Sequence, residues 1–263
     1  MLKSKRLIII SIVMIALAAA IAGFIRLKYV VPVVMYHSVS EISEPKNRTH
    51  VSTAVFERQM LFLKKHHYNV LPLTKVAELI KNHQKIPAKT IAITFDDGYK
   101  NNYTYAYPIL KKYNLPAVIF IILDEVGRPQ GDRLDWAQIK EMQATGLITI
   151  GSHALGPEPL INYKSEEVLR RQIFDSKRLL QQNLGVPIEI FSYPGGMFNA
   201  AIRRMVIDAG YKLAAATNPG KDYPSDDIFA IKRLRISENA GNLFVFGVEI
   251  SGFYTFMKEH RHK

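Results

Sequence analysis

The sequence predicts an α/β domain built around a parallel β-sheet, either open or closed into a barrel. The first observation is an alternation of short apolar runs with amphipathic stretches, which is typical of repeated strand-then-helix units. The second is that polar residues suited to catalysis follow several apolar runs, where the carboxyl ends of parallel strands meet their loops. The third is that 263 residues with 48% apolar and 22% charged side chains suffice for one sizeable core.

The expected strands are seven segments rich in Ile, Val, Phe or Tyr. They are residues 31–36, 90–95, 117–123, 147–151, 188–193, 212–216 and 229–236. Between them lie stretches with helical periodicity. Residues 29–263 contain no Pro/Gly/Ser-rich linker and no repeat, so we expect a single domain there.

Two of the helices have clear start signals. Residues 165–184 place their apolar side chains on one stripe, with Ser165 as the N-cap and Gly185 as the end. Asp135, followed three residues later by Gln138, predicts a capping box at the start of a second helix.

An N-terminal segment, residues 7–25, predicts a membrane-spanning helix. Its nineteen residues carry no charge, and at 1.5 Å per residue they reach about 28 Å, close to the thickness of the hydrocarbon core. A buried globular helix would have a polar face, whereas here only Ser11 and Gly23 interrupt the apolar surface. We therefore divide the chain into residues 1–28, a membrane anchor or signal segment, and residues 29–263, the domain.

The charges around this segment predict its orientation. Lys3, Lys5 and Arg6 precede it, which favours a cytoplasmic N-terminus and an extracytoplasmic domain on a single-pass cell-membrane protein. The small residues at positions 18–22 are compatible with signal-peptidase cleavage, which would give a secreted protein. The apolar run is longer than a usual signal core, so we expect a retained anchor. The absence of cysteine fits an exported protein without disulfides.

The net charge of +12 does not indicate nucleic-acid binding. Of the 35 Lys and Arg residues, five lie in residues 1–28, which contain no acid, and the others are spread along the chain. The domain has no arginine-rich arm, zinc knuckle or aromatic-plus-basic RNA-binding motif. We therefore expect no nucleic-acid partner.

Two adjacent carboxylates, Asp96 and Asp97, end the second predicted strand and are followed by Gly98, which permits a sharp turn. Adjacent side chains on an extended backbone point in opposite directions. One carboxylate can then bind a metal while the other acts as a general base toward water. The simpler alternative is a solvated Asp-Asp-Gly turn.

A histidine, His153, follows the fourth predicted strand. Its imidazole suits a zinc-type ion, although a lone histidine is as often structural as functional. With Asp97 it gives two ligands, whereas a catalytic zinc usually takes three from the protein plus a water.

These residues belong to four motifs that together resemble the polysaccharide deacetylase family, also called the NodB homology domain or carbohydrate esterase family 4. The resemblance covers about residues 31–236. The motifs are residues 31–38 (VPVVMYHS), 94–99 (TFDDGY), 150–153 (IGSH) and 191–196 (FSYPGG). The string TFDDGY is very specific, and its order with the other three leaves little room for chance.

The resemblance implies a distorted (β/α) barrel of NodB type, preceded here by one transmembrane helix, that removes N-acetyl groups from a polysaccharide. It implies a divalent metal, expected to be zinc, held by Asp97 and His153. Asp96 is then similar to the family's general base, and His37 to the histidine that protonates the leaving amine. The backbone N–H of Gly195 would hold the oxyanion.

Aromatic side chains near these motifs are candidates for sugar binding. Tyr193 and Trp136 have flat faces that can stack on a sugar ring, and both are equally plausible as core residues. We expect an N-acetylated polysaccharide of the cell envelope or outside the cell as the substrate.

The chain departs from the family's pattern at the expected metal site. Where the family's second motif ordinarily has another histidine, this sequence has Pro157, which cannot bind a metal. The hydroxyl residue usual after the first histidine is Ala154, and the aromatic usual after the proline of the third motif is Gly195. Glu158 is a candidate to replace this histidine as a metal ligand, and His50 is a weaker candidate. The alternative is that Glu158 is only a surface residue.

Three function classes follow from this pattern. The first is an active metal-dependent deacetylase with an altered ligand set, favoured because Asp96, Asp97, His37 and His153 are all present. The second is a metal-independent hydrolase that acts on another amide. The third is a catalytically degenerate domain that binds glycan. The two adjacent acids argue against the third class, because their mutual repulsion costs energy and gives a binding cleft no evident benefit.

Overall fold

Parallel strands form the centre of the domain, as expected. The structure, a computed structural model, describes residues 10–17, 20, 23, 29–43, 46–217, 220 and 223–260. The main sheet consists of β1 (Val33–Tyr36), β5 (Thr90–Phe95), β6 (Ala117–Ile121), β7 (Ile148–Ser152), β8 (Ile190–Ser192), β9 (Leu213–Ala216), β10 (Ile231–Lys232) and β11 (Leu234–Arg235), with the short β4 (Asn69–Val70) beside β5.

The sheet closes almost completely into a barrel. Its order is β10-β9-β8-β7-β6-β5-β1-β11, and all its pairings are parallel. The two end strands are consecutive in the chain, since only Arg233 separates β10 from β11. The last strand segment therefore pairs with β9 before Arg233 and with β1 after it, and we call Arg233 the seam of the barrel.

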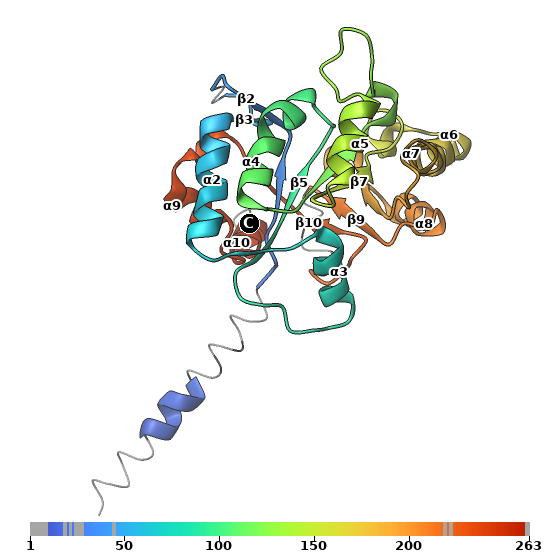
Figure 1. Ribbon diagram of the computed structural model, residues 1–263. Coiled ribbons are helices and arrows are strands. Elements are labelled where there is room, and N and C mark those ends of the chain that lie inside the picture. Colours follow the sequence, from blue (N-terminus) through green and yellow to red (C-terminus); the bar gives the residue numbers. More distant parts are fainter. Residues whose placement is uncertain are drawn as a thin grey trace, which may run out of the picture.

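Helices surround the sheet, as Figure 1 shows. They are α2 (Thr53–Lys65), α3 (Leu73–Lys81), α4 (Tyr107–Tyr113), α5 (Trp136–Ala144), α6 (Glu166–Arg170), α7 (Ser176–Leu184), α8 (Ala200–Asp208), α9 (Leu243–Glu249) and α10 (Tyr254–His260). The two predicted start signals are confirmed. Asp135 and Gln138 form a capping box at α5, and the Ser165 hydroxyl accepts a hydrogen bond from the Val168 N–H at α6.

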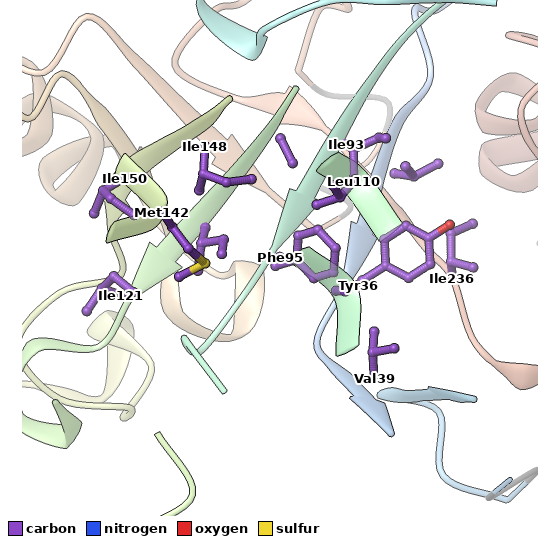
Figure 2. Close-up of a cluster of buried hydrophobic side chains, with 14 of the residues drawn as sticks. Tyr36, Val39, Ile93, Phe95, Leu110, Ile121, Met142, Ile148, Ile150 and Ile236 are labelled. Atoms are coloured by element: carbon purple, nitrogen blue, oxygen red, sulfur yellow. The ribbon is translucent and has the colours of Figure 1, made fainter. Parts of the chain in front are cut away.

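Two apolar clusters hold the layers together. The larger lies between the sheet and its helices, where Phe95 and Tyr36 stack and Met142 of α5 reaches the strand residues Ile148 and Ile150 (Figure 2). The smaller fills the inside of the barrel and includes residues of α3, which closes the barrel's amino end. The barrel interior is so tight that a Cβ on Gly151 would lie 2.5 Å from the Phe120 ring, so that position requires glycine.

The seven predicted strand segments are all strands, and the last of them is divided at the seam into β10 and β11. The sequence did not indicate β2 (Ser38–Ser40), β3 (His50–Ser52) or β4, each of only two or three residues. The predicted helix 165–184 is broken by a π-helical turn, Arg171–Asp175, between α6 and α7.

The predicted membrane segment, residues 7–25, lies mainly outside the described residues. Only residues 10–17, 20 and 23 of it are described. Over the described part of the chain, no helix combines the length and the apolar character that a membrane span requires.

Candidate active site

Asp96 lies at the carboxyl end of β5, inside the barrel, and is held by Arg233. The two carboxylate oxygens accept hydrogen bonds of 2.6 and 2.7 Å from the Arg233 Nη1 and Nη2 groups. Both side chains are buried, with exposed fractions of 4% and 0%. Burial alone would raise the pKa of Asp96, but the charges of Arg233 and His153 outweigh it and hold that pKa well below its usual range. Asp96 is therefore a carboxylate at every working pH.

All five N–H donors of Arg233 have acceptors. Besides Asp96, the guanidinium donates to the Ser192 hydroxyl at 2.8 Å, to the Ala216 carbonyl at 3.2 Å and to the Thr94 hydroxyl at 3.3 Å. A buried charge is tolerated when it is paired and fully hydrogen-bonded. Arg233 therefore connects Asp96 to residues of β5, β8 and β9 and fixes its position.

Asp97 and His153 face one another across the edge of the barrel. The Asp97 Oδ1 lies 3.5 Å from the His153 Nε2, and the Asp96 Oδ2 lies 3.9 Å from the same nitrogen. The expectation that the two carboxylates point in opposite directions is wrong. Asp97 has a left-handed φ of 70°, so the chain turns there and both carboxylates converge on His153.

The ring of His153 has a fixed orientation. Its Nδ1 lies 2.8 Å from the Ser192 carbonyl, which can only accept, so Nδ1 carries a proton and Nε2 is left to face the carboxylates. Burial lowers the pKa of His153, but the two carboxylate charges more than compensate and the net shift is upward. Burial raises the pKa of Asp97, but the hydrogen bond and charge of His153 bring it below its usual value.

His37 follows β1, and its backbone is held next to Asp96. The Asp96 N–H donates to the Tyr36 carbonyl at 2.9 Å, and the Asn102 amide donates to the His37 carbonyl at 2.7 Å. The His37 ring is buried, and within the described residues its Nδ1 has no hydrogen-bond partner. Burial lowers the pKa of His37, and the charges of Asp96 and Asp97 only partly oppose this.

Gly195 lies in the turn Pro194–Gly196 that follows β8, with a φ of 66°. A Cβ there would lie 3.2 Å from the Cγ of Pro159. The turn therefore belongs to the same edge of the barrel as Asp96 and His153, because β7 and β8 are paired.

The two aromatic candidates differ in exposure. Tyr193 is fully buried, stacks on Phe198 and donates its hydroxyl to the Phe229 carbonyl at 3.0 Å. The expectation that Tyr193 offers a face to sugar is therefore wrong, and it is a core residue. Trp136 is half-buried against the core and keeps part of its surface exposed, so its sugar-binding role stays a prediction.

Glu158 does not join the metal-type residues. It is exposed, and its carboxylate accepts a hydrogen bond from the Asn162 amide. Among the residues that the structure describes, no group of three His, Cys, Asp or Glu side chains is arranged to hold a metal. His50 is also elsewhere, since its ring contacts the Ser38 hydroxyl and the Ile42 carbonyl. The expected third ligand is thus absent from the described site.

Sequence reasoning missed Arg233 and Ser192. The available signal was the presence of three cations, Lys232, Arg233 and Arg235, within the strand segment 229–236, because a cation that is buried there requires a buried partner. Ser192 gave no signal of its own, although it serves both Arg233 and His153.

Comparison with known proteins decides the family. The sequence profile described as "Polysaccharide deacetylase" matches residues 83–214, half of the chain. The chain belongs to the polysaccharide deacetylase family. The predicted resemblance and the predicted enzyme class, a carbohydrate deacetylase among the hydrolases, are thereby confirmed.

Individual relatives of the deacetylase extend this match. YxkH of Bacillus subtilis strain 168 is 33% identical over 206 residues, which cover 78% of this chain and 71% of YxkH. The poly-β-1,6-N-acetyl-D-glucosamine N-deacetylase of Staphylococcus aureus strain MRSA252 is 31% identical over 211 residues, or 76% of this chain and 72% of the enzyme.

A solved structure agrees with the fold of the deacetylase. The deacetylase PplD of Streptococcus pyogenes, determined in complex with acetate, superposes with a TM-score of 0.72 at 28% identity. The superposition covers 82% of this chain and 96% of PplD. The nearly closed parallel barrel of NodB type is thereby confirmed.

Proposed function

We propose that the protein is a membrane-anchored, exported hydrolase that removes N-acetyl groups from an envelope or extracellular polysaccharide with the help of a divalent metal. The observation that carries the proposal is the pair of adjacent carboxylates. Asp96 is held by Arg233, and Asp97 faces the Nε2 of His153. The name of the Staphylococcus aureus relative supports poly-N-acetylglucosamine as one substrate to test.

The residues fit a metal with two protein ligands. A carboxylate oxygen and an imidazole nitrogen only 3.5 Å apart are donors that zinc, cobalt or nickel accept. The hydrogen bond from His153 Nδ1 to the Ser192 carbonyl fixes the orientation of the ring, as such a bond usually does for a histidine that binds a metal through its other nitrogen. Water and substrate would complete the coordination in place of a third side chain.

The low pKa of Asp96 supports the proposed involvement of a metal. A carboxylate whose pKa is held so low accepts a proton only from an acidic donor. A bound divalent metal makes water more acidic and polarises the amide carbonyl. In the proposed reaction Asp96 would take a proton from a water molecule whose oxygen attacks the amide carbonyl, while the Gly195 N–H donates to the developing oxyanion. The C–N bond would then break as His37 protonates the leaving amine, and acetate would be released.

A metal-independent or degenerate domain is the second candidate function. Pro157 in place of the usual second histidine and the exposure of Glu158 favour it. In that case the protein binds glycan or hydrolyses another amide without a metal.

Zinc binding separates the two candidates. We expect the full chain in detergent to bind zinc with micromolar or tighter affinity in calorimetry, and Asp97→Ala and His153→Ala to abolish this binding. Glu158→Ala is the matched control and should bind as the original protein does, because Glu158 lies away from both ligands. Absence of binding to the unaltered chain would favour the metal-independent candidate, and binding by Asp97→Ala would refute the ligand set.

His37→Ala is expected to lower the deacetylation rate by about 10²–10⁴-fold, the usual contribution of a general acid. An acid must carry its proton, and burial lowers the pKa of His37 from 6.5. The basic limb of the pH profile of kcat/KM should therefore lie below pH 6.5 and disappear in the variant. A pH profile that His37→Ala leaves unchanged would show that His37 is only a core residue.

The location of the protein is proposed from its sequence. The uncharged residues 7–25 would span the membrane with the preceding Lys3, Lys5 and Arg6 in the cytoplasm. Residues 29–263 would then face the outside, and cleavage after the apolar segment would release them as a secreted enzyme.

A further inference from the structure

Arg235 lies at the carboxyl edge of the barrel, close in sequence to Arg233, the residue that binds the proposed base Asp96. It ends β11, two residues after Arg233, and alternate residues of an extended strand point to the same face. Arg233 points inward to Asp96, so Arg235 lies on the same inner face, one step nearer the carboxyl edge. It is exposed, whereas Arg233 is buried.

The strand register brings Arg235 close to His37. Arg235 pairs with Met35 of β1, and the Ile236 N–H donates to the Met35 carbonyl at 3.0 Å. His37 is two residues beyond Met35 on the same side of β1. The charge of Arg235 contributes, after burial, to the lowered pKa of His37, which agrees with this proximity.

Two further cations come from segments next to these strands. Arg48 is two residues before His50, whose backbone pairs with Ser38, and Lys258 is next to Glu259, whose carboxylate binds Lys232 of β10. Arg48 comes from the segment before β3 and Lys258 from α10, and both residues are exposed. Burial of part of its side chain lowers the pKa of Lys258, and the charges of Arg235 and Arg48 lower it further. In the described part of the chain, no carboxylate forms an ion pair with any of these three cations.

Nearby acids offset only part of this positive charge. Burial raises the pKa of Glu249 to about 7, so this carboxylate, which acts on Lys258, is only partly ionised at neutral pH. Burial raises the pKa of Glu238, but hydrogen bonds from Ser52 and Ser43 outweigh it, so this carboxylate is ionised and is turned toward those two residues. Asp97 faces His153.

We infer that Arg235, together with Arg48 and Lys258, forms an anion-binding subsite beside His37, which accepts a phosphate or carboxylate group carried by the glycan substrate. We call these three residues the cationic mouth. The inference rests on the proposed function in one respect, namely that a glycan enters at this edge of the barrel. The planar guanidinium of an arginine can donate two parallel hydrogen bonds to a carboxylate or to a phosphate, so Arg235 suits either anion.

The charge of the product supports an anionic glycan. Each deacetylation leaves an ammonium group, so a neutral polymer becomes a polycation that the cationic mouth repels. A glycan with regularly placed acidic groups becomes zwitterionic instead. Its acidic groups are still attracted to the cations of this subsite. The cationic mouth therefore favours anionic over neutral polymers both on entry and during repeated turnover.

The test compares substrates that differ only in an anionic group. Deacetylation by the full chain in detergent is measured on a neutral N-acetylglucosamine oligomer, on an oligomer with carboxylate-bearing sugars, and on one with glycerol-phosphate groups. We expect Arg235→Gln to lower the ratio of kcat/KM for an anionic substrate to that for the neutral one by at least tenfold. Any change in the pKa of His37 affects all substrates alike and cancels in this ratio.

The matched control is Arg204→Gln, which removes an arginine charge on α8, where Arg204 pairs with Asp208 and is 75% exposed. It should leave the ratio within twofold. A ratio unchanged by Arg235→Gln would overturn the inference. A loss confined to the carboxylate or to the phosphate substrate would identify which group the subsite takes.

Binding of inorganic phosphate separates the inference from the proposed function. We expect the full chain to bind phosphate in calorimetry and Arg235→Gln to weaken that binding at least fivefold. If the protein deacetylates none of the oligomers but binds phosphate through Arg235, the proposed function fails and the subsite stands. If it deacetylates the neutral oligomer and neither the ratio nor phosphate binding depends on Arg235, the subsite fails and the function stands.

Discussion

Asp96→Asn should abolish measurable deacetylation, with a loss of about 10⁴-fold, the upper end for a positioned general base. The substitution keeps the size of the side chain and removes its capacity to accept a proton. It also replaces one acceptor oxygen by an amide group that cannot accept from the Arg233 fork. The measurement is acetate release from an N-acetylglucosamine oligomer by the full chain.

Two controls make the result of Asp96→Asn specific. Zinc affinity should be retained, because the proposed ligands are Asp97 and His153 and neither is changed. Asp96→Glu keeps the carboxylate and displaces it by one methylene, so it should retain more activity than Asp96→Asn. Equal turnover by Asp96→Asn and the unaltered enzyme would show that another group is the base.

Arg233→Met is expected to lower the free energy of unfolding by about 3–5 kcal/mol, because it leaves the buried Asp96 charge without its partner. Asp96, Ser192 and Thr94 also lose hydrogen bonds from the guanidinium. Urea unfolding at pH 7 measures the change. Arg233→Lys keeps the charge but not the fork, so it should be intermediate. A stability within 1 kcal/mol of the unaltered enzyme would contradict the role of Arg233.

The same pair predicts how stability depends on pH. The folded-state pKa of Asp96 lies below the unfolded value of about 3.9, so the carboxylate stabilises the fold above that pH. This contribution is lost as the pH falls from about 4 toward the depressed pKa. In Arg233→Met the loss between about pH 4 and pH 2 should be smaller, because the cause of the low pKa is gone.

The strand pattern was predictable because it depends on local sequence. Buried parallel strands are continuous apolar runs, and every such run in residues 29–236 became a strand. The caps at Ser165 and Asp135 were predictable for the same reason, since each depends on residues within one turn. The short β2 and β3 could not be predicted, because three residues carry no periodicity.

The composition of the site was less predictable, because it depends on contacts between distant residues. Asp96 and Arg233 are 137 positions apart, and no local pattern connects them. Glu158 has a side chain suited to a metal, but the packing of its loop leaves it exposed and bonded to Asn162, which its sequence position did not indicate. Tyr193 illustrates the same limit, since its position beside a motif did not reveal that its ring is buried.

The seam at Arg233 has a consequence for the order in which the enzyme is made. Synthesis proceeds from the amino end, so Asp96 leaves the ribosome 137 residues before its counter-charge. Until residues 231–235 have been synthesised, β1 and β9 each have an unpaired edge, and Asp96 lacks its partner Arg233. Closing of the barrel and pairing of Asp96 with Arg233 are thus one event, so we expect a chain that lacks the last strand to have no deacetylase activity.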